Sequence, residues 1–335
     1  MLPAPRSLLQ DLTLQDFKVL TSVERVVSQS RSVFFHPDRI GTAIFEWGHQ
    51  LESGTSWDRP CHFFDGAEES VRWIFTLDVL NHCFWPDPGK PVWTIVYNGE
   101  RYSGYRGLAA GLKRAQEQGF AITDPHFLSA ISAGDLAEIF SGQGVIPMFD
   151  ERLRNLREAG SIILSELGGD IMSLLRAASG SAVRLVREVV SHFPSFRDEA
   201  LYRSRAVYFW KRAQIFVSDI FTAFSGKGYG EFRDIQRLTA FADYKLPQVL
   251  RELGIISYDY RLASRIDSME FLQAGSEEEV EIRAMTVWAA EHVRKAFQRH
   301  GRNLANAEID SWLWGLGQLD AFRKRPYHRC RTIFY

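Results

Sequence analysis

Residues 241–254 read FADYKLPQVLRELG, and this stretch predicts a short helix that begins close to an aspartate. Pro247 fits the first helical turn, where its missing N–H leaves no hydrogen bond unmade. Gly254 fits the left-handed residue that commonly ends a helix. The apolar residues recur with helical spacing and form one face: Leu246, Val249, Leu250 and Leu253. The stretch therefore predicts a packed helix with Asp243 at or just before its N-terminus.

Asp243 has two interpretations. Taken alone, a helix cap is favoured, because aspartate is among the commonest N-cap residues. The alternative is an ionised carboxylate held in a fixed position, which an enzyme that cleaves a sugar bond requires. Free N–H groups and the helix dipole stabilise the charged form, so we expect Asp243 to stay ionised at neutral pH.

The composition disfavours two classes of protein. The chain has 335 residues, 45% hydrophobic and 24% charged, which is ordinary for a globular protein with a sizeable core. Its formal net charge is −1, whereas proteins that grip DNA or RNA normally carry a basic surplus. The sequence has no apolar signal core at its N-terminus and no apolar run long enough to cross a membrane. We therefore expect a cytoplasmic protein that binds neither membranes nor, tightly, polymeric nucleic acid.

The cysteines and the known catalytic motifs narrow the chemistry further. Cys61, Cys83 and Cys330 are far apart and lack CxxC spacing, which favours a reducing compartment and argues against a zinc site built on cysteine. The HExxH, GxSxG, Walker A and kinase signatures are absent. The scattered histidines form no recognisable metal triad. The motifs thus give no sign of a metal or a cofactor, and a metal site assembled in the fold from histidines far apart in the sequence stays open.

The fold predicted from the pattern is mainly α with a small β-hairpin appendage, in a single domain over 1–335. Asn98-Gly99 between two strand-like runs predicts a hairpin near 92–103. After this hairpin the chain is expected to be helical to its end. Helical spacing of apolar residues or helix-like composition marks the stretches 8–33, 69–85, 207–219, 279–294 and 306–314, and the segment 40–53 contains an aromatic cluster with a histidine.

Several polar residues stand out in apolar surroundings. Asp78 and Asn81 lie in the nearly apolar stretch 69–85, where they need partners. His49 belongs to an aromatic cluster, and a structural histidine is favoured there over a catalytic one. Asp310 and Trp314 are four apart and share a helix face.

The helical spacing of 207–219 also places Lys211, Gln214 and Ser218 on one face. On spacing alone a solvated face is favoured, and the alternative is a pocket wall with a fixed cation. The glycine-rich run 225–230 matches neither GxGxxG nor the Walker A pattern, so it is interpreted as a loop. Carboxylates embedded among aromatic residues suit a flat, partly cationic ligand: Asp78, Asp198, Asp243 and Asp310.

Four blocks, in order along almost the whole chain, resemble the queuosine salvage protein family, the queuosine 5′-phosphate N-glycosylase/hydrolases. They are LDVLN with FW at 77–85, FWKRAQ at 209–214, FADYKLPQ at 241–248 and EVEIR at 279–283. The segment HRCRT at 328–332 fits as well. The blocks at 209–214 and 241–248 are the most specific.

This resemblance implies hydrolysis of queuosine 5′-monophosphate to queuine and ribose 5-phosphate without a metal. It implies a helical fold similar to the helix-hairpin-helix DNA glycosylases, and a small nucleotide as the partner of a monomeric enzyme. It suggests Asp243 as the catalytic carboxylate and, more loosely, a site lined by His49, Lys211, Phe241, Tyr244, Asp310 and Trp314.

Two carboxylates, Asp78 and Asp310, are candidates to pair with the secondary amine of the base, which is cationic at pH 7. Lys211 is a candidate to meet the 5′-phosphate or the Asp243 carboxylate. Two other functions stay open: a DNA base-excision glycosylase, which needs a basic duplex-binding face, and a non-catalytic nucleoside- or tRNA-binding protein, which would bind without turnover.

Overall fold

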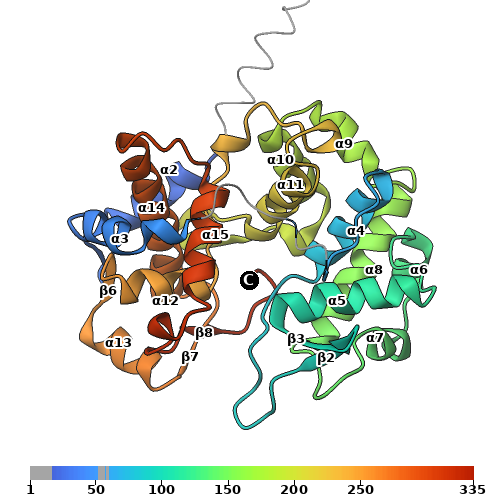
Figure 1. Cartoon of the computed structure of the whole chain (residues 1–335), viewed down its shortest axis with the longest axis horizontal. Helices are drawn as coiled ribbons and strands as arrows, with labels where there is room; N and C mark the ends of the chain where they lie inside the picture. The colour runs from blue at the N-terminus through green and yellow to red at the C-terminus, as the bar shows by residue number, and fades with distance from the viewer. Residues whose placement is uncertain (1–16, 52–56, 58–59) are drawn as a thin grey trace, which may run out of the picture.

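The computed structural model describes residues 17–51, 57 and 60–335, and it is mainly helical. The helices form two lobes that lie side by side (Figure 1). The first lobe contains α4 (Glu68–Val79), α5 (Gly104–Glu117), α6 (Pro125–Ala130), α7 (Ala133–Ile139), α8 (Phe149–Glu166), α9 (Met172–Ala178), α10 (Ala182–His192) and α11 (Lys211–Ala223). The second lobe contains α3 (Arg39–Trp47), α12 (Lys245–Glu252), α13 (Tyr260–Asp267), α14 (Glu277–Arg299) and α15 (Asn306–Leu316).

Each lobe has its own hydrophobic core. Helix α2 (Val19–Val27) links the two, because it packs against α14 of the second lobe while its buried valines belong to the core of the first. A third, small apolar cluster lies apart from both cores and consists of Ile215, Phe241 and Ala307. Ile215 comes from α11 and Ala307 from α15, so these two helices border the region where the lobes meet (Figure 1).

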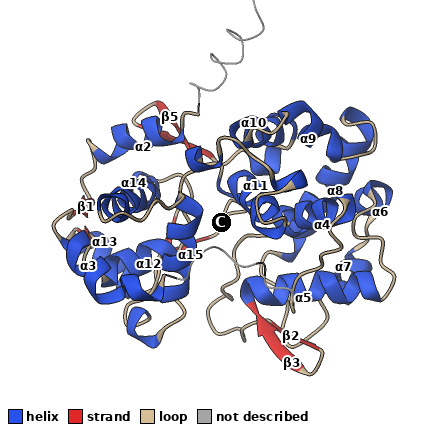
Figure 2. Ribbon diagram, turned by 45° about the horizontal axis from the view of Figure 1, so that its top comes forward, coloured by secondary structure: helices blue, strands red, loops and turns tan. Residues whose placement is uncertain are grey.

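The strands are short and form, within the described residues, four two-stranded sheets. The predicted hairpin is confirmed as β2 (Thr94–Tyr97) and β3 (Glu100–Ser103), which projects from the edge of the first lobe (Figure 2). Asn98 and Gly99 both have positive φ, as its two-residue turn requires. The other pairs are β1 (Val33–Phe35) with β6 (Ile256–Tyr258), β4 (Glu199–Tyr202) with β5 (Arg205–Tyr208), and β7 (Phe271–Leu272) with β8 (Arg329–Cys330). The prediction of a chain helical to its end after the first hairpin was therefore wrong.

Several predicted helices are present with changed bounds. Residues 8–16 lie outside the described residues, and the rest of the first predicted helix is α2 followed by strand β1. The helix predicted over 69–85 ends at Val79, and the one predicted over 207–219 begins at Lys211, because residues 205–208 form a strand. The stretch 40–53 forms α3 and the 3₁₀ turn η1 (Gly48–Gln50), and its residues 52 and 53 are not described. The single-domain assignment stays a prediction.

Helix α12 forms where the sequence predicts it, and its ends have the expected chemistry. Pro247 is in the first turn, and Gly254 follows the helix with a φ of +71°. The buried side chains include Leu246, Val249 and Leu250, and they pack in the core of the second lobe. The glycine-rich run at 225–230 is a turn with the 3₁₀ element η3 (Gly228–Gly230), as interpreted from the sequence.

Candidate active site

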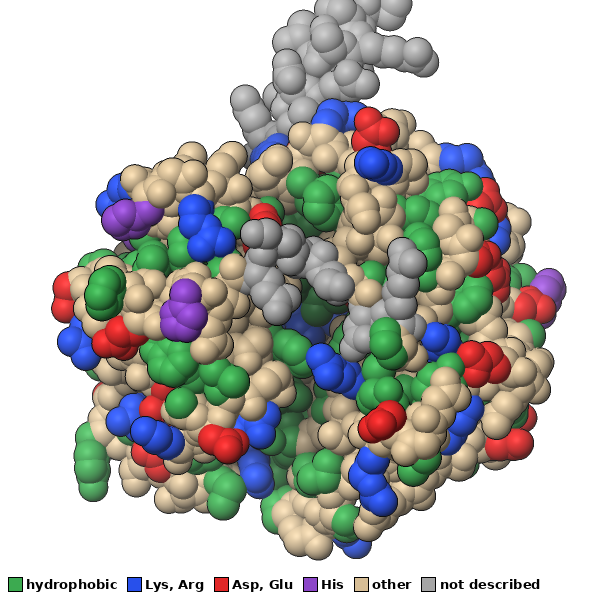
Figure 3. Space-filling view, viewed as in Figure 1, with side chains coloured by type: hydrophobic (Ala, Val, Ile, Leu, Met, Phe, Trp, Pro, Cys, Tyr) green, Lys and Arg blue, Asp and Glu red, His purple; other side chains and the backbone are tan. Residues whose placement is uncertain are grey.

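A groove runs between the two lobes, with hydrophobic side chains on its walls and Lys or Arg side chains along it (Figure 3). Ionisable groups from both lobes meet here. Lys211 begins α11 of the first lobe, whereas Asp243 precedes α12 and Asp310 belongs to α15 of the second. These three side chains influence one another electrostatically. The site is therefore built where the lobes meet.

Asp243 is anchored by the helix that follows it. Its Oδ1 accepts hydrogen bonds from the backbone N–H groups of Lys245, at 2.8 Å, and of Leu246, at 2.9 Å. Burial raises the pKa of Asp243 above its ordinary value, while the charge of Lys211 and the two backbone N–H groups lower it. The helix end alone led us to expect a stabilised charge, but burial decides the direction. Asp243 is thus both a helix cap and a carboxylate held in a poorly solvated place.

Lys211 is the cation that faces this carboxylate. Its side chain is buried, and burial lowers the pKa of the ammonium group, whereas Asp243, Asp310 and Asp78 raise it. Within the part of the chain that the structure describes, the ammonium group makes no hydrogen bond and no ion pair within 4.0 Å, and its interactions are electrostatic. The ammonium group of Lys211 is therefore available to form a hydrogen bond or an ion pair with a bound ligand.

The solvated face predicted for α11 was wrong. Lys211, Gln214 and Ser218 are all buried, and Gln214 is 0% exposed. The Gln214 amide donates to the carbonyl of Phe209, at 2.8 Å, and its oxygen accepts from the backbone N–H of Thr239, also at 2.8 Å. These bonds connect the start of α11 to the segment that leads to Asp243. Helical spacing cannot tell a solvated polar face from one that is buried at an interface between lobes.

Asp310 lies close to Asp243 and binds the backbone two residues before it in the sequence. Its Oδ1 accepts a hydrogen bond of 2.7 Å from the N–H of Phe241. Burial, together with the charge of Asp243, raises the pKa of Asp310 well above its ordinary value. Trp314 lies one helical turn further along α15, half-buried, and packs on the core of the second lobe.

A second pair of carboxyl groups comes from the first lobe. Asp78, in α4, is 0% exposed, and its Oδ1 accepts a hydrogen bond of 3.1 Å from Asn81. Burial raises the pKa of Asp78 to about 7, against the lowering effects of Asn81, Lys211 and Arg212. Asp219, in α11, has a pKa well above its ordinary value because of burial and the charge of Asp78. The Oδ2 atoms of Asp78 and Asp219 have no hydrogen-bond partner within the described residues.

Sequence reasoning missed Asp219. The residue follows Ser218 on the helix that begins with Lys211, so the available signal was a carboxylate two turns after a lysine in an apolar helix. The carboxylate cluster is now defined as Asp78, Asp219, Asp243 and Asp310, with Lys211 as its cation.

Two fully buried arginines fix the end of α4 and with it Asp78. Arg212 donates to the carbonyls of Asp78, at 3.0 Å, and Val79, at 2.5 Å. Arg152 donates to the carbonyls of the next residues, Leu80, His82 and Cys83. The last carbonyls of a helix lack partners within it and carry negative partial charge, so guanidinium groups stabilise this end. This is the physical reason why α4 ends before the predicted boundary.

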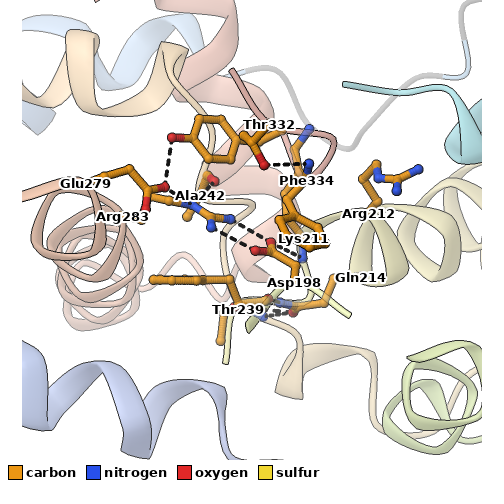
Figure 4. A network of polar contacts seen from close by, with 12 residues as sticks. Asp198, Lys211, Arg212, Gln214, Thr239, Ala242, Glu279, Arg283, Thr332 and Phe334 are labelled. Atoms are coloured by element: carbon orange, nitrogen blue, oxygen red, sulfur yellow. Dashed lines mark hydrogen bonds and ion pairs between the residues drawn. The ribbon is translucent and has the colours of Figure 1, made fainter. Parts of the chain in front are cut away.

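An ion-pair network around Asp198 and Arg283 connects the backbone of α11 in the first lobe with α14 in the second (Figure 4). Arg283 of α14 donates to both carboxylate oxygens of Asp198, at 2.8 and 2.6 Å, and its Nε donates to the carbonyl of Ala242, at 3.1 Å. Asp198 also accepts a hydrogen bond of 3.1 Å from the backbone N–H of Lys211. The network therefore holds the backbone of Lys211 and the residue that precedes Asp243.

The same arginine is enclosed by aromatic rings. Its guanidinium carbon lies 4.0 Å from the ring centre of Phe209 and 4.4 Å from that of Tyr335. The Tyr335 hydroxyl donates to Glu279 at 2.8 Å, and the backbone carbonyl of Tyr335 accepts a bond from Cys83. The segment that ends at Tyr335 thus lies packed between the lobes (Figure 1).

The remaining predicted site residues differ in their distance from this cluster. Phe241 is buried in the small apolar cluster, and its N–H is bound by Asp310. Burial and the nearby charge of Asp243 raise the pKa of Tyr244 well above its ordinary value, and its ring centre lies 4.8 Å from that of Tyr327. His49 lies in η1, is exposed, and shows no contact with the cluster among the described residues. The role of His49 in the site stays a prediction.

Among the residues that the structure describes, no group of three or more His, Cys, Asp or Glu side chains is arranged to hold a metal ion. The carboxyl groups of the cluster instead interact electrostatically with one another and with Lys211. Such an arrangement can hold one charged and one neutral carboxyl group side by side, as acid–base chemistry requires.

Comparison with known proteins gives a consistent result. A family model described as queuosine salvage protein matches residues 61–335. A protein of Sphaerobacter thermophilus named queuosine 5′-phosphate N-glycosylase/hydrolase is 46% identical over 317 residues, which cover 95% of this chain and 97% of that protein. Proteins of the same name from Mus musculus and Schizosaccharomyces pombe are 35% and 33% identical, over 81% and 89% of this chain and 83% and 90% of their own length.

Proposed function

This chain belongs to the queuosine salvage protein family, and we propose that it hydrolyses the N-glycosidic bond of queuosine 5′-monophosphate, releasing queuine and ribose 5-phosphate. The observation that carries the proposal is the half-buried carboxylate of Asp243, anchored by two backbone N–H groups and close to the cation of Lys211. An N-glycosidase needs a fixed carboxylate of this kind.

In the reaction, the bond between C1′ and the glycosidic nitrogen breaks, and its electron pair leaves with the base. Positive charge develops on the sugar, and the carboxylate of Asp243 stabilises it. Water then supplies a hydroxyl group to C1′ and, in the net reaction, a proton to the base. Lys211 supports the step by lowering the pKa of Asp243, which keeps the carboxylate charged at lower pH.

Asp310 has the complementary role in this proposal. The base is a 7-deazaguanine and lacks the N7 that purine hydrolases commonly protonate, so help for the leaving group must reach another atom. Asp310 keeps its proton to higher pH than a solvated aspartate does. A neutral carboxyl group can donate a hydrogen bond or a proton, while Asp243 next to it acts in its charged form. We propose that the wall of the site around these two groups includes Phe241, Tyr244, Trp314 and His49.

We also propose a monomeric cytoplasmic enzyme that acts on the free nucleotide. The net charge of −1 supports a small substrate rather than a nucleic acid polymer. Cys61, Cys83 and Cys330 are all buried, and Cys83 and Cys330 carry free thiols, which supports a reducing compartment. None of the described helices is long and apolar enough to span a membrane. The mainly helical build supports a relationship to the helix-hairpin-helix DNA glycosylases, which superposition on their solved structures tests.

The test is base release by chelator-treated protein. Purified protein is incubated with queuosine 5′-monophosphate, and the products are identified by mass spectrometry. We expect queuine and ribose 5-phosphate without added metal, and a loss of turnover of about a hundredfold or more in Asp243→Asn, because a positioned charge is lost. Binding without release would favour a nucleotide-binding protein. Release from damaged duplex DNA alone would favour a DNA glycosylase.

A further inference from the structure

Asp78 and Asp219 form a carboxyl pair in the first lobe that the proposed cleavage step does not use. Asp78 is fully buried, and one oxygen of each carboxyl group lacks a hydrogen-bond partner within the described residues. A buried polar atom without a hydrogen-bond partner destabilises the folded protein, so its retention calls for an explanation. The Asp219 side chain is half-buried and reaches the surface in part, whereas its unpartnered Oδ2 atom and the whole of Asp78 are buried.

The charges around this pair are unbalanced. The carboxylate cluster contains four acidic side chains but a single lysine. The charge of Lys211 acts most strongly on Asp243, so little of it is left to balance Asp78 and Asp219. Arg212, the other nearby cation, directs its Nη1 and Nη2 groups to backbone carbonyls rather than to the carboxyl oxygens. A cation that entered here would find unused acceptor atoms, and its charge would lower the pKa of both carboxyl groups and favour their charged forms.

An aromatic cluster is connected to Asp219 through Tyr105. Tyr105 hydrogen-bonds to Asp219, and its hydroxyl lies 3.0 Å from Nε2 of His62. The His62 ring stacks on Trp57 with 4.0 Å between ring centres, and Trp73 packs edge-on against both. Aromatic faces beside carboxylates are the recurring environment for organic ammonium groups.

We propose that Asp219, backed by the charge of Asp78, binds the secondary ammonium group that the queuine base carries on its 7-substituent. The pair thereby determines specificity for 7-deazaguanine nucleotides with a cationic aminomethyl group. This inference rests on the proposed function, because it takes the same nucleotide as the substrate. It assigns the two lobes different tasks: the second lobe supplies Asp243 and Asp310 for bond cleavage, and the first lobe recognises the base.

The experiment compares two substrates that differ in charge. The 5′-monophosphates of 7-aminomethyl-7-deazaguanosine, which is cationic, and 7-cyano-7-deazaguanosine, which is neutral, are given to the wild-type protein and to Asp219→Asn. The ratio of the two kcat/KM values is the readout, because a general loss of folded protein cancels in it. Asp170→Asn is the matched control, since it removes a carboxylate from the same lobe that pairs with Arg72 at the surface.

We expect the wild-type protein to prefer the cationic substrate at least about tenfold, as a buried charge pair is worth. In Asp219→Asn the ratio should fall toward one, and in Asp170→Asn it should stay at the wild-type value. A wild-type ratio near one, or an unchanged preference in Asp219→Asn, would overturn the inference while base release still upheld the proposed function. No release by the wild-type protein from either analogue or from queuosine 5′-monophosphate would overturn the proposed function and the inference with it.

Discussion

Two sets of buried polar residues, the ion-pair network and the carboxylate cluster, lie next to each other and differ in how many of their polar atoms have hydrogen-bond partners. In the ion-pair network, Arg283 donates a hydrogen bond to each carboxylate oxygen of Asp198. Glu279 accepts hydrogen bonds from the Tyr335 hydroxyl and the Gly275 N–H. In the carboxylate cluster, Asp78 and Asp219 keep unpartnered oxygens within the described residues. The carboxylates of the network thus have their hydrogen-bond partners within the protein, whereas the cluster has acceptor atoms left for a ligand.

The pKa directions separate the two groups in the same way. The neighbouring carboxylates, Asp198 first, raise the pKa of Arg283 further, against the effect of burial, so this charge is secured by its surroundings. In the cluster, burial raises the pKa of all four carboxyl groups. Natural proteins satisfy buried polar groups except where a function needs them otherwise. The comparison therefore locates function in the cluster and structural support in the network.

The largest expected effect is on the network. Asp198→Asn leaves the guanidinium of Arg283 without its buried carboxylate, so we expect the free energy of unfolding to fall by about 3–5 kcal/mol. Chemical denaturation measures this. The matched control is Asp267→Asn, which breaks a bidentate pair with Arg251 where the carboxylate is 45% exposed, and which should cost about 1 kcal/mol. An equal decrease in the free energy of unfolding of the two variants would mean that the buried network stabilises the protein no more than a partly exposed ion pair does.

The next effect has the opposite sign. Because the pKa of Asp78 is about 7 in the folded protein and near 4 in the unfolded chain, its contribution to stability is present below pH 4 and is lost as the pH rises to 7. Asp78→Asn mimics the protonated form, so it should stabilise the protein at pH 8 by about 2–4 kcal/mol. At pH 4 the gain should shrink below about 1 kcal/mol.

Denaturation curves of Asp78→Asn and the wild-type protein at the two pH values provide the measurement. A variant that is equally destabilised at pH 4 and pH 8 would mean that the carboxyl group of Asp78 is simply a satisfied structural group. The cluster would then resemble the network, and the contrast between the two would fail.

A smaller effect concerns Lys211. Its charge is the largest influence that lowers the pKa of Asp243, so Lys211→Met should raise that pKa further. Activity needs the ionised carboxylate, so the acidic limb of the pH–kcat/KM profile should move to higher pH. A shift of one unit lowers kcat/KM by about tenfold at pH values on that limb and leaves the plateau unchanged. Lys245→Met is the graded control, because Lys245 has a weaker influence on Asp243. A loss of activity that does not depend on pH would contradict this role.

The sequence was sufficient for features with local signals. Pro247 and Gly254 mark the ends of α12, and Asn98-Gly99 specifies the first hairpin. Helices α14 and α15 were found because long runs keep helical spacing. The family blocks led to Asp243, Lys211 and Asp310, whose proximity only the fold can reveal.

The missed features have no local signal. The turn between β4 and β5 is Arg203-Ser204, with positive φ at both residues, although neither type normally marks such a turn. Strands β1 and β6 pair Val33 with Tyr258 across most of the chain, which no short window contains. The polar face of α11 is buried by segments far away in the sequence, and Asp219 meets Asp78 and Tyr105 only in the fold, so helical spacing alone suggested solvent there.

The most direct test of the difference between the two groups is Asp243→Asn, assayed for turnover of queuosine 5′-monophosphate and for stability in the same preparation. Asparagine can still accept the N–H bonds of Lys245 and Leu246, so we predict a free energy of unfolding within about 1 kcal/mol of the wild-type value. Turnover should fall by about a hundredfold or more. Near-normal turnover, or a loss of stability of about 3 kcal/mol like that expected for Asp198→Asn, would show that Asp243 is a structural cap and contradict the account.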